Sequence, residues 1–373
     1  MKWTFWLAAG LIVYAYAGYA VFLRFRLLWK AHPVRRQAAL PSVSIVMVVR
    51  NEEKVLKAKL NNLLGLDYPE DRFDVVVVSD GSTDRTAEIL REYSRDPRLR
   101  IVLNQLSRGK AAGLNDALTV ATGEIVLFTD ARQRIEPFAP RLLVENFADP
   151  EVGCASGELM LGDPVRGEVA EGVGLYWRVE KTIRELESCS GSVVGATGAL
   201  YAVRRELLIS VPPGTILDDV YLPMQVVRQG KRVVFDPRAR AWDVADQGAR
   251  REFSRKVRTL SGNYQLLRLA PWLLSSRNPI RFEFISHKIL RLIVPLALIA
   301  MLLTCVVLKG PFYRAMLAMQ LTFYALSTLS LLHVVKRGVV ARVANAAGTF
   351  VLLNGAAALA FANFLSGKRV GWR

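Results

Sequence analysis

The stretch 75–84, with the sequence VVVVSDGSTD, contains the pattern that decides the fold of this chain. Four consecutive β-branched residues are typical of a strand that is buried on both faces, as strands are in a parallel sheet. The polar residues that follow end the strand, and Ser82 is a good N-cap for a helix over about 83–93. The segment therefore predicts a buried strand, a polar loop and a helix, in that order.

Two other apolar runs repeat this arrangement. Val43–Val49 (VSIVMVV) and Ile125–Phe128 (IVLF) are short and almost wholly apolar, and residues with helical spacing occupy 52–64 and 109–120. Strands and helices that alternate in this way predict an α/β fold with a mostly parallel, Rossmann-like sheet and right-handed crossovers.

A polar loop follows each of these three strands. The loops are Arg50-Asn51-Glu52, Ser79-Asp80-Gly81-Ser82 and Thr129-Asp130-Ala131. Because the carboxyl ends of parallel strands meet at one edge of a sheet, where open α/β proteins bind ligands, we expect these loops to lie together. Each loop alone could be an ordinary turn or helix cap, but three acid-bearing loops at one edge exceed what the fold requires.

The composition argues against several classes of protein. The chain has 373 residues, of which 52% are hydrophobic and 22% charged, so it is not a disordered chain. Its three cysteines have no C-x-x-C spacing, which argues against a disulfide scaffold or a zinc site. The 50 Lys and Arg outnumber the 33 Asp and Glu, which gives a formal net charge of +17. The mean hydropathy, +0.23, is high for a soluble protein.

Four long apolar runs account for the hydropathy: residues 3–23, 292–308, 315–335 and 343–366. Each run is a candidate transmembrane helix. Basic residues at 24–36 follow the first run, so the positive-inside rule puts the amino terminus outside and the following domain in the cytoplasm. Ala15-Tyr16-Ala17 resembles a signal-peptide cleavage site, but the run is too long and its basic flank lies on the wrong side. We therefore predict an integral protein of the inner or plasma membrane.

These segments predict four parts: an amino-terminal transmembrane helix with a basic linker (1–36), a cytoplasmic domain (37–262), an interfacial amphipathic segment (263–284, with a helix over 264–274) and a carboxyl-terminal region of about three transmembrane helices (285–373). Three carboxyl-terminal spans would place the basic tail outside, against the positive-inside rule. Either one run is re-entrant, or a span is miscounted, or the short tail is tolerated there.

The basic residues beside the apolar runs fit attraction to anionic membrane lipids. The sequence contains no RNP, zinc-finger or helix-turn-helix pattern, which argues against a nucleic-acid partner. The apolar runs contain almost no charge that would mark a solute pathway, so a transporter lacks support.

Six motifs, taken in order, resemble the family 2 glycosyltransferases of GT-A fold, specifically the membrane-integrated branch that includes hyaluronan, chitin and cellulose synthases. The resemblance covers about residues 41–262. The motifs are PSVSIV leading to RNEE (41–53), SDGSTD (79–84), RGKAAGLN (108–115), TDAR (129–132), GATG (195–198) and DDVYL (218–222). The resemblance implies a GT-A domain, a nucleotide-diphosphate sugar donor, with a UDP-sugar favoured, and transfer with inversion at the anomeric centre.

The resemblance implies donor-binding roles for ten residues. They are Arg50, Asn51, Glu52, Asp80, Ser82, Arg108, Gly109, Lys110, Asp130 and Arg132. Asp80 would accept a hydrogen bond from the edge of the base, and Asn51 and Glu52 would line the base and ribose pocket. Lys110 would contact the base or the diphosphate, and Gly109 would allow close approach of the backbone.

Asp130 matches the first acid of the family's Asp-x-Asp metal motif, which implies Mg²⁺ or Mn²⁺ as a cofactor. Such a metal would stabilise the charge that develops on the diphosphate leaving group. Arg132 stands where the second acid would be. Either the metal is held by one carboxylate together with phosphates and water, which we favour, or Arg132 contacts phosphate itself and metal dependence is weaker.

Asp219, with Asp218 beside it, matches the catalytic acid of the family's Glu/Asp-Asp-x-x-Leu motif. Asp219 would act as the base on the acceptor hydroxyl, and repulsion by Asp218 could raise its pKa toward a useful value. The alternative is an ordinary pair of helix-capping acids. The small residues Gly195, Ala196, Thr197 and Gly198 resemble the acceptor-side loop of the family.

The last cytoplasmic motif departs from the family. Residues 247–251 (QGARR) keep the Gln and Arg of the processive Gln-x-x-Arg-Trp motif but have Arg251 in place of Trp. The missing Trp removes a stacking surface for an acceptor sugar, which puts processive polymerisation in doubt. The basic residues Arg255, Lys256 and Arg258 are either a clamp for the diphosphate or a patch on the membrane surface.

Two classes of function follow from these motifs. The first is a membrane enzyme that transfers a sugar to a lipid-linked acceptor or a growing polysaccharide. Four spans are few for a private channel, so either a homo-oligomer or transfer of a single sugar is favoured. The second is a catalytically degenerate scaffold in an envelope-polysaccharide assembly complex, against which the retained Asp80, Lys110, Asp130 and Asp219 argue.

Overall fold

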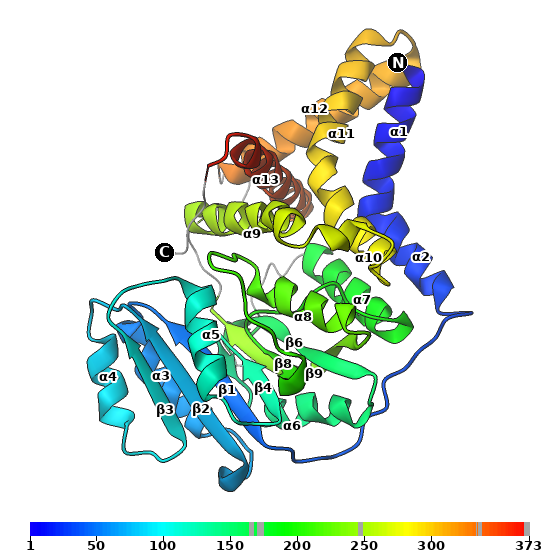
Figure 1. Ribbon diagram of the computed structural model, residues 1–373. Helices are drawn as coiled ribbons and strands as arrows, with labels where there is room; N and C mark the ends of the chain where they lie inside the picture. Colours follow the sequence, from blue (N-terminus) through cyan, green and yellow to red (C-terminus); the bar gives the residue numbers. More distant parts are fainter. Residues whose placement is uncertain (164–167, 170–174, 245–248, 333, 335–337, 369–373) are drawn as a thin grey trace.

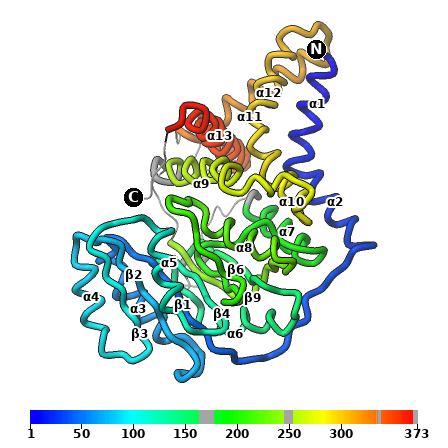
Figure 2. Tube along the Cα trace, in the orientation of Figure 1, coloured from blue at the N-terminus to red at the C-terminus, as the bar shows by residue number. Residues whose placement is uncertain are grey.

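The computed structural model describes residues 1–163, 168–169, 175–244, 249–332, 334 and 338–368. A mixed α/β domain lies at one end of the molecule, and a group of long helices extends from it (Figure 1). The amino terminus lies at the end of these helices that is farthest from the sheet (Figures 1 and 2).

Nine strands of the described residues form the sheet, in the order β3-β2-β1-β4-β8-β6-β9-β5, with β7 paired to β6. The strands are β1 (Val43–Val49), β2 (Phe73–Asp80), β3 (Leu99–Asn104), β4 (Ile125–Phe128), β5 (Arg134–Ile135), β6 (Val152–Asp163), β7 (Glu168–Val169), β8 (Tyr201–Arg204) and β9 (Arg232–Asp243).

The first half of the sheet is parallel, as predicted. β1 pairs in parallel with β2 and β4, and β2 pairs in parallel with β3. Helices α3 (Glu53–Leu64), α4 (Thr86–Tyr93) and α5 (Lys110–Val120) connect these strands. In the second half, β8 runs antiparallel to β4 and β6, and β5 runs antiparallel to β9. The sheet is therefore mixed, and only the half that carries the three polar loops has the predicted parallel order.

Apolar side chains cover both faces of the sheet. In β1, Val46 and Val48 belong to one core, and Ile45 and Met47 belong to the other, as the alternation of side chains along a strand requires. Helices α3 and α4, with α6 (Ala139–Val144), pack on the second core, whereas α5 and α8 (Asp218–Arg228) pack on the first. Burial on both faces explains why β1 and β2 are apolar almost throughout.

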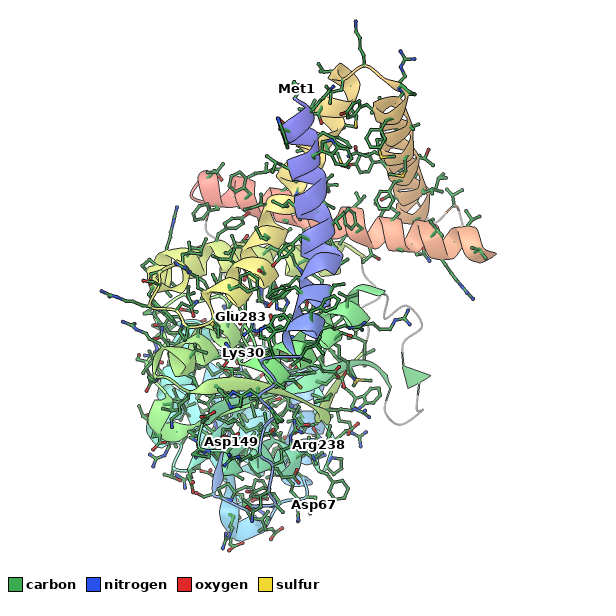
Figure 3. All side chains as sticks on the ribbon, turned by 90° about the vertical axis from the view of Figure 1, so that its right-hand side faces the viewer. Met1, Lys30, Asp67, Asp149, Arg238 and Glu283 are labelled. Atoms are coloured by element: carbon green, nitrogen blue, oxygen red, sulfur yellow. The ribbon has the colours of Figure 1, made fainter. Side chains whose placement is uncertain are left out.

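Three helices of the described residues are long and apolar enough to cross a membrane. They are 2–26, which contains α1 (Lys2–Val13) and α2 (Tyr19–Arg26); 281–307, which contains α10 (Arg281–Phe284) and α11 (Leu290–Val307); and α13 (Gly338–Leu365). Most of the predicted span 315–335 belongs to α12 (Pro311–Leu331), which is less apolar because it carries Arg314 and Gln320. Residues 333 and 335 of this span lie outside the described residues. Figure 3 shows α1, α11 and α12 alongside one another, with α13 lying across them.

The end of α13 returns to the α/β domain. Gly367 and Lys368 line a cavity together with Lys110 and Asp130, which belong to the polar edge of the sheet. The start of the basic tail therefore lies on the same side as the α/β domain. Of the alternatives that the sequence left open, this agrees with a re-entrant or miscounted run rather than with a tail on the opposite side.

Helix α9 (Ala249–Leu269) joins the two regions of the molecule. The domain boundary predicted at residue 262 falls inside α9, and the helix predicted over 264–274 is the end of α9 followed by a 3-10 turn, Pro271–Leu274. The helix stops at this point because Pro271 cannot donate a backbone hydrogen bond. Leu266 and Leu273 are buried in the core of the α/β domain, so this segment packs on protein.

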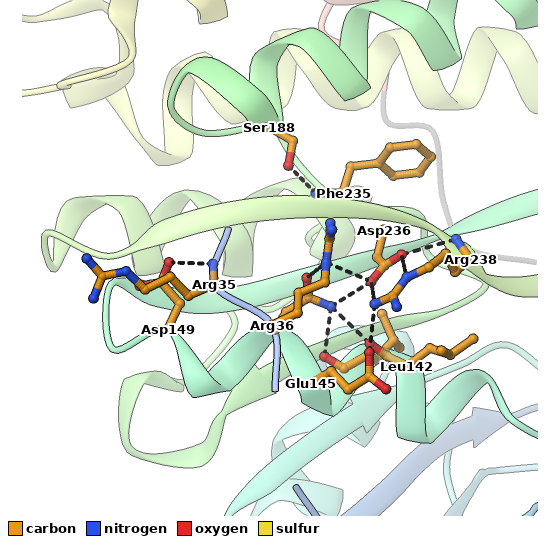
Figure 4. A network of polar contacts seen from close by, with 11 residues as sticks. Arg35, Arg36, Leu142, Glu145, Asp149, Ser188, Phe235, Asp236 and Arg238 are labelled. Atoms are coloured by element: carbon orange, nitrogen blue, oxygen red, sulfur yellow. Dashed lines mark hydrogen bonds and ion pairs between the residues drawn. The ribbon is translucent and has the colours of Figure 1, made fainter. Parts of the chain in front are cut away.

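The linker between α2 and β1 lies along the α/β domain and is held there by polar contacts (Figure 4). The Arg35 backbone N–H donates to Asp149 Oδ2 at 3.2 Å, and Arg36 Nε donates to Asn146 Oδ1 at 2.9 Å. Arg36 also forms an ion pair with the buried Asp236, at 3.4 Å. The basic linker is therefore part of the folded domain as well as a flank of the first long helix.

Two buried contacts attach the amino-terminal helix to its neighbours. Arg26 Nη1 donates to Glu283 Oε1 at 2.5 Å, and both side chains are less than 10% exposed. Tyr19 Oη donates to Glu187 Oε1 at 2.8 Å, and Glu187 belongs to α7 (Leu175–Ser190). The helix is thus bonded both to α10 and to the α/β domain.

We predict that Arg26→Ala lowers the melting temperature of the full chain by roughly 5 °C or more, because it leaves the Glu283 carboxylate buried without its partner. The matched control is Arg24→Ala on the same helix, whose side chain is exposed. Thermal unfolding in nanodiscs measures both variants, and equal melting temperatures would contradict the anchoring role of Arg26.

Candidate active site

Asp80 ends β2 and is fully buried. Its carboxylate accepts hydrogen bonds from Ser107 Oγ at 2.7 Å, from the Arg108 backbone N–H at 2.8 Å and from the Gly109 backbone N–H at 2.9 Å. Asp80 is not among the residues that line the cavity. Both carboxylate oxygens therefore hold the loop that precedes α5, and the hydrogen bond that Asp80 is predicted to accept from a base stays a prediction.

Gly81 allows that loop to approach the end of β2. Its φ is +62°, and a Cβ at this position would lie 2.3 Å from the Ser107 backbone nitrogen. Only glycine fits such an approach to backbone atoms. Gly109, with φ +91°, then lets the chain turn into α5, so that Lys110 is the first residue of that helix.

The loop after β1 is bonded to the loop after β2. Asn51 has φ +55°, a conformation that Asn tolerates better than most residues. Its Oδ1 accepts a hydrogen bond from the Thr83 backbone N–H at 2.8 Å, and its own backbone N–H donates to Ser82 Oγ at 3.2 Å. Of the residues in these two loops that are predicted to bind the sugar donor, only Glu52 lines the cavity. Burial raises the pKa of the Glu52 carboxyl. Arg50, Asn51 and Ser82 do not line it.

Lys110 connects two of the predicted acids. Its Nζ lies 2.9 Å from Asp130 Oδ1, after β4, and 3.1 Å from Asp218 Oδ2, at the start of α8. Burial alone would lower the pKa of Lys110, but the carboxylates of Asp130, Asp218 and Asp219 raise it above its ordinary value. The lysine is therefore a permanent cation between acids from separate elements. Arg108, which also forms an ion pair with Asp116, lies outside this group.

Asp219 completes the acidic group. Its Oδ2 accepts a hydrogen bond from the Gly198 backbone N–H at 3.2 Å. A Cβ on Gly198 would lie 3.1 Å from Asp219 Oδ2 and 3.6 Å from Asp130 Oδ2. Both carboxylates therefore lie close to the Cα of Gly198. Burial and the neighbouring Asp218 raise the pKa of Asp219 to about 6, although Lys110 opposes the shift. The sequence-predicted repulsion between the two acids is therefore present.

Lys110, Asp130 and Asp218 line a cavity of about 1030 Å³, and Asp219 lies beside them without being a lining residue. The sheet edge contributes Glu52, Ser107, Gly109, Lys110, Asp130, Arg132, Asp218 and Asp243. The opposite side is basic: Arg255, Arg258 and Arg268 of α9, and Lys368 after α13. The cavity thus has acids together with Lys110 and Arg132 on the sheet side, and the cations Arg255, Arg258, Arg268 and Lys368 on the helix side.

Two of the three predicted clamp residues face this cavity. Arg255 and Arg258 are three residues apart on one face of α9 and both line it. Lys256 belongs to another face of the helix, where its Nζ lies 5.2 Å from the centre of the Trp177 ring. The helix period therefore separates Lys256 from the proposed clamp.

Arg132 does not pair with Asp130. Its Nη2 lies 3.2 Å from both carboxylate oxygens of Asp243, and Gln133 Nε2 donates to the same carboxylate at 2.9 Å. The Asp130 side chain stays 41% exposed on the cavity. Within the described residues, no group of three or more His, Cys, Asp or Glu side chains could hold a metal. One open carboxylate fits Mg²⁺ or Mn²⁺ only if substrate oxygens and water complete the coordination.

Lys59 supports the Asp130 loop from behind, a role that the sequence analysis missed. The side chain is buried, and its Nζ donates to Thr129 Oγ1 at 2.9 Å and to the Gln133 carbonyl oxygen at 2.6 Å. Burial lowers the pKa of this lysine to about 7, and Asp130 opposes the shift. The sequence did indicate that Lys59 is buried, because this lysine falls on the same face of α3 as the apolar residues Leu56, Leu60 and Leu63.

The predicted acceptor loop lies beside Asp219. The Ala196 backbone N–H donates to the Asp219 carbonyl oxygen at 2.7 Å, and Thr197 Oγ1 accepts a hydrogen bond from Arg184 Nη1 at 2.6 Å. Arg184 also pairs with Glu180, at 3.6 Å, and Glu180 lies 2.9 Å from His287 Nε2 at the start of a long helix. Polar contacts therefore connect the acceptor loop to the helices beyond the domain.

The predicted motif at 247–251 lies partly outside the described residues. Gln247 and Gly248 are not described, and Ala249 is where α9 begins.

Comparisons with known proteins agree with this architecture. Residues 44–211 match the glycosyl transferase family 2 domain. Poly-β-1,6-N-acetyl-D-glucosamine synthases of Staphylococcus epidermidis and of Staphylococcus aureus strain COL are 24% identical to the chain over 231 and 239 residues. These alignments cover 60% and 61% of this chain and 55% and 56% of the relatives. The chain thus spans about half the length of the curated relatives that it matches.

A solved structure is similar over nearly the whole chain. It is the mannosyltransferase PcManGT from Pyrobaculum calidifontis, determined in complex with GDP-Man and Mn²⁺. The two share 23% identity, the match covers 98% of this chain and 99% of the other, and the TM-score is 0.75. The predicted GT-A fold is confirmed, and so is the resemblance of the domain to family 2 glycosyltransferases.

The stability of the ligand-free protein can show whether Asp80 positions the loop before α5 or binds the nucleotide directly. Asp80→Asn places an N–H group where two oxygens now accept three hydrogen bonds, so we expect the ligand-free protein to lose about 1–3 kcal/mol of stability. The control is Asp71→Asn, whose side chain is exposed. If chemical denaturation of the ligand-free variant matched the wild type while nucleotide binding fell, Asp80 would instead contact the ligand directly.

Proposed function

We propose that this chain, whose residues 44–211 match the glycosyl transferase family 2 domain, moves a sugar from a nucleotide-diphosphate sugar to a hydroxyl acceptor beside the membrane, with inversion. One observation carries the proposal: Lys110 and the carboxylates of Asp130 and Asp218 line a single cavity, at the carboxyl edge of the parallel strands. Asp219, the next residue after Asp218, lies beside this group, and its carboxylate is close to Gly198, as that of Asp130 is. A glycosyltransferase needs both a diphosphate site and a base in such a place.

The cavity suits the donor in size and charge. Its volume, about 1030 Å³, is enough for a nucleotide sugar, and the cations Arg255, Arg258 and Arg268 face the acids across it. Arginine side chains bind phosphate oxygens through directed pairs of hydrogen bonds. We propose that the diphosphate lies between Lys110 and the basic face of α9, with a UDP-sugar as the favoured donor.

Asp219 is the proposed base. In the single displacement that we propose, the acceptor oxygen forms a bond to the anomeric carbon while the bond from that carbon to the diphosphate breaks. The acceptor's proton passes to the carboxylate of Asp219, and the diphosphate leaves with the electron pair. The raised pKa of Asp219 makes it a stronger base than an ordinary aspartate, and the Gly198 N–H holds it in place.

The divalent metal would be held by Asp130, with phosphate oxygens and water as its other ligands. It would supply positive charge to the departing diphosphate. The Mn²⁺ that accompanies GDP-Man in the Pyrobaculum enzyme supports a metal here. Arg132 is paired with Asp243, and both residues line the cavity on the same sheet edge as Asp130.

The acceptor is proposed to reach Asp219 from the membrane side. The Gly195–Gly198 loop borders Asp219 and is bonded through Arg184 and Glu180 to the start of a long helix. A lipid-linked sugar or a growing polysaccharide fits this approach, and the relatives named above are synthases of a polysaccharide, poly-β-1,6-N-acetyl-D-glucosamine. We propose that the domain faces the cytoplasm, and the basic flank of the first helix supports this orientation.

We predict that Asp219→Asn lowers sugar transfer by at least about a hundredfold while leaving donor affinity within about threefold of the wild type. The assay incubates the purified full chain in nanodiscs with a panel of UDP- and GDP-sugars and an acceptor lipid extract, and records nucleoside diphosphate release. Release from one donor by the wild type and not by the variant supports the proposal. Donor binding with no release by the wild type would favour the scaffold instead.

The pKa of Asp219 fixes the pH dependence that we expect. Only the deprotonated carboxylate can accept the proton, and the pKa of this group is about 6. The value of kcat/KM should therefore rise about tenfold per pH unit below pH 6 and level off above it. A profile that is flat between pH 5 and pH 7 would remove Asp219 from the role of base.

Removal of the metal should abolish transfer. With EDTA present we expect release of nucleoside diphosphate to stop, and with Mg²⁺ or Mn²⁺ restored we expect it to return. Asp130→Asn should weaken metal-dependent donor binding by tenfold or more, since it removes the one open carboxylate. Full activity in EDTA would show that the cations of the cavity stabilise the leaving group without a metal.

A further inference from the structure

The carboxyl-terminal end of α13 forms one side of the cavity. Asn363, Phe364, Gly367 and Lys368 line it together with the α9 arginines and the acids of the sheet edge. No motif in the sequence pointed to this segment, since it lies far along the chain from the family 2 domain and follows an apolar helix. The cavity is therefore built jointly by the α/β domain and by a helix that is long and apolar enough to cross a membrane.

The end of α13 is fixed by its backbone. The Lys368 N–H donates to the Asn363 carbonyl oxygen at 3.0 Å, and the Gly367 N–H donates to the Phe364 carbonyl oxygen at 3.3 Å. Gly367 has φ +68°. These two hydrogen bonds and the left-handed glycine make a Schellman motif, which ends the helix and reverses the chain. The reversal gives Lys368 a defined position at the cavity.

Side-chain contacts fix the same helix end on α9. The Phe364 ring stacks on Tyr264, with ring centres 5.1 Å apart, and the Arg268 guanidinium lies 4.3 Å from the centre of the Phe364 ring. Arg268 itself lines the cavity. The aromatic ring therefore holds an arginine at the cavity without neutralising its charge.

Several positive charges around the cavity are not paired with a carboxylate, so the cavity can attract an anion. Lys110 is paired with Asp130 and Asp218, and Arg132 is paired with Asp243. Among the described residues, Arg255, Arg258, Arg268 and Lys368 have no carboxylate partner within ion-pair distance, and all four lie on the helix side of the cavity. A ligand with two adjacent phosphates supplies the negative charge that these groups lack.

We propose that Lys368 binds the diphosphate of the donor, and that Phe364 positions Arg268 for the same task. This inference rests on the proposed function, because the cavity must first bind a nucleoside diphosphate. The end of α13 then closes the donor site from the membrane side, so that the site is complete only when α13 is seated on α9.

The test measures binding of UDP, GDP and the uncharged nucleosides uridine and guanosine by calorimetry, with the full chain in nanodiscs. Lys368→Gln should weaken binding of the preferred diphosphate about tenfold and leave binding of its nucleoside unchanged. Lys368→Arg should retain most of the affinity. The matched control is Lys30→Gln, an exposed lysine that follows the first long helix and does not line the cavity.

The variant Phe364→Leu is a second test of the same proposal. It keeps the apolar volume of the helix end but removes the aromatic face under Arg268, so we expect a loss of diphosphate affinity of about threefold to tenfold. A change in nucleoside binding of equal size would indicate damage to the cavity and would overturn the positioning role.

The outcomes separate this inference from the proposed function. If the wild type binds a nucleoside diphosphate and transfers sugar, and Lys368→Gln does both equally well, the role of Lys368 is wrong and the glycosyltransferase proposal stands. If the wild type binds no nucleoside diphosphate at all, the donor site itself is wrong, and both proposals fall.

Discussion

Lys110 is the group on which the geometry of the site depends. Its ammonium lies between Asp130 and Asp218, which belong to separate elements and would repel each other and Asp219 without a cation among them. A buried carboxylate is tolerated when it is paired and hydrogen-bonded, and it is costly when it is not. Asp80 sets the position of Lys110 because it holds the loop that precedes α5. Polar contacts thus run from the end of β2, through α5, to the acids after β4 and at the start of α8.

The long helices take part in the site and do more than attach it to a membrane. On one side, Glu180 and Arg184 connect His287, near the start of the long helix 281–307, to Thr197 in the loop beside Asp219. On the other, Phe364 of α13 holds Arg268 of α9 at the cavity. The proposed base and the proposed diphosphate site each depend on a helix that packs outside the α/β domain, so the seating of these helices and the chemistry of the cavity are linked.

The sequence predicted the parallel half of the sheet because β1 and β2 are buried on both faces, and such strands must be apolar throughout. It also predicted that the loops after β1, β2 and β4 share one edge of the sheet, because the carboxyl ends of parallel strands meet there. Asp218 and Asp219, at the start of α8, were assigned by the resemblance alone, and the contacts of Lys110 with Asp130 and Asp218 were not predicted. It could not predict that Asp80 holds a loop, since that depends on how Ser107 and Gly109 return to the end of β2. Nor could it place Lys368, because its position follows from how α13 crosses α9. Lys256 was grouped with Arg255 and Arg258 by proximity in sequence, although the helix period turns it away.

The most direct test of the central claim is a structure of the full chain in nanodiscs with UDP and Mn²⁺, determined by cryo-electron microscopy. The account predicts that the metal contacts Asp130, and that the diphosphate lies between Lys110 and the arginines of α9. Asp219 would then lie on the side of the diphosphate to which the sugar is attached in the donor. A diphosphate bound at another surface, with Lys110 still enclosed by the acids, would contradict it.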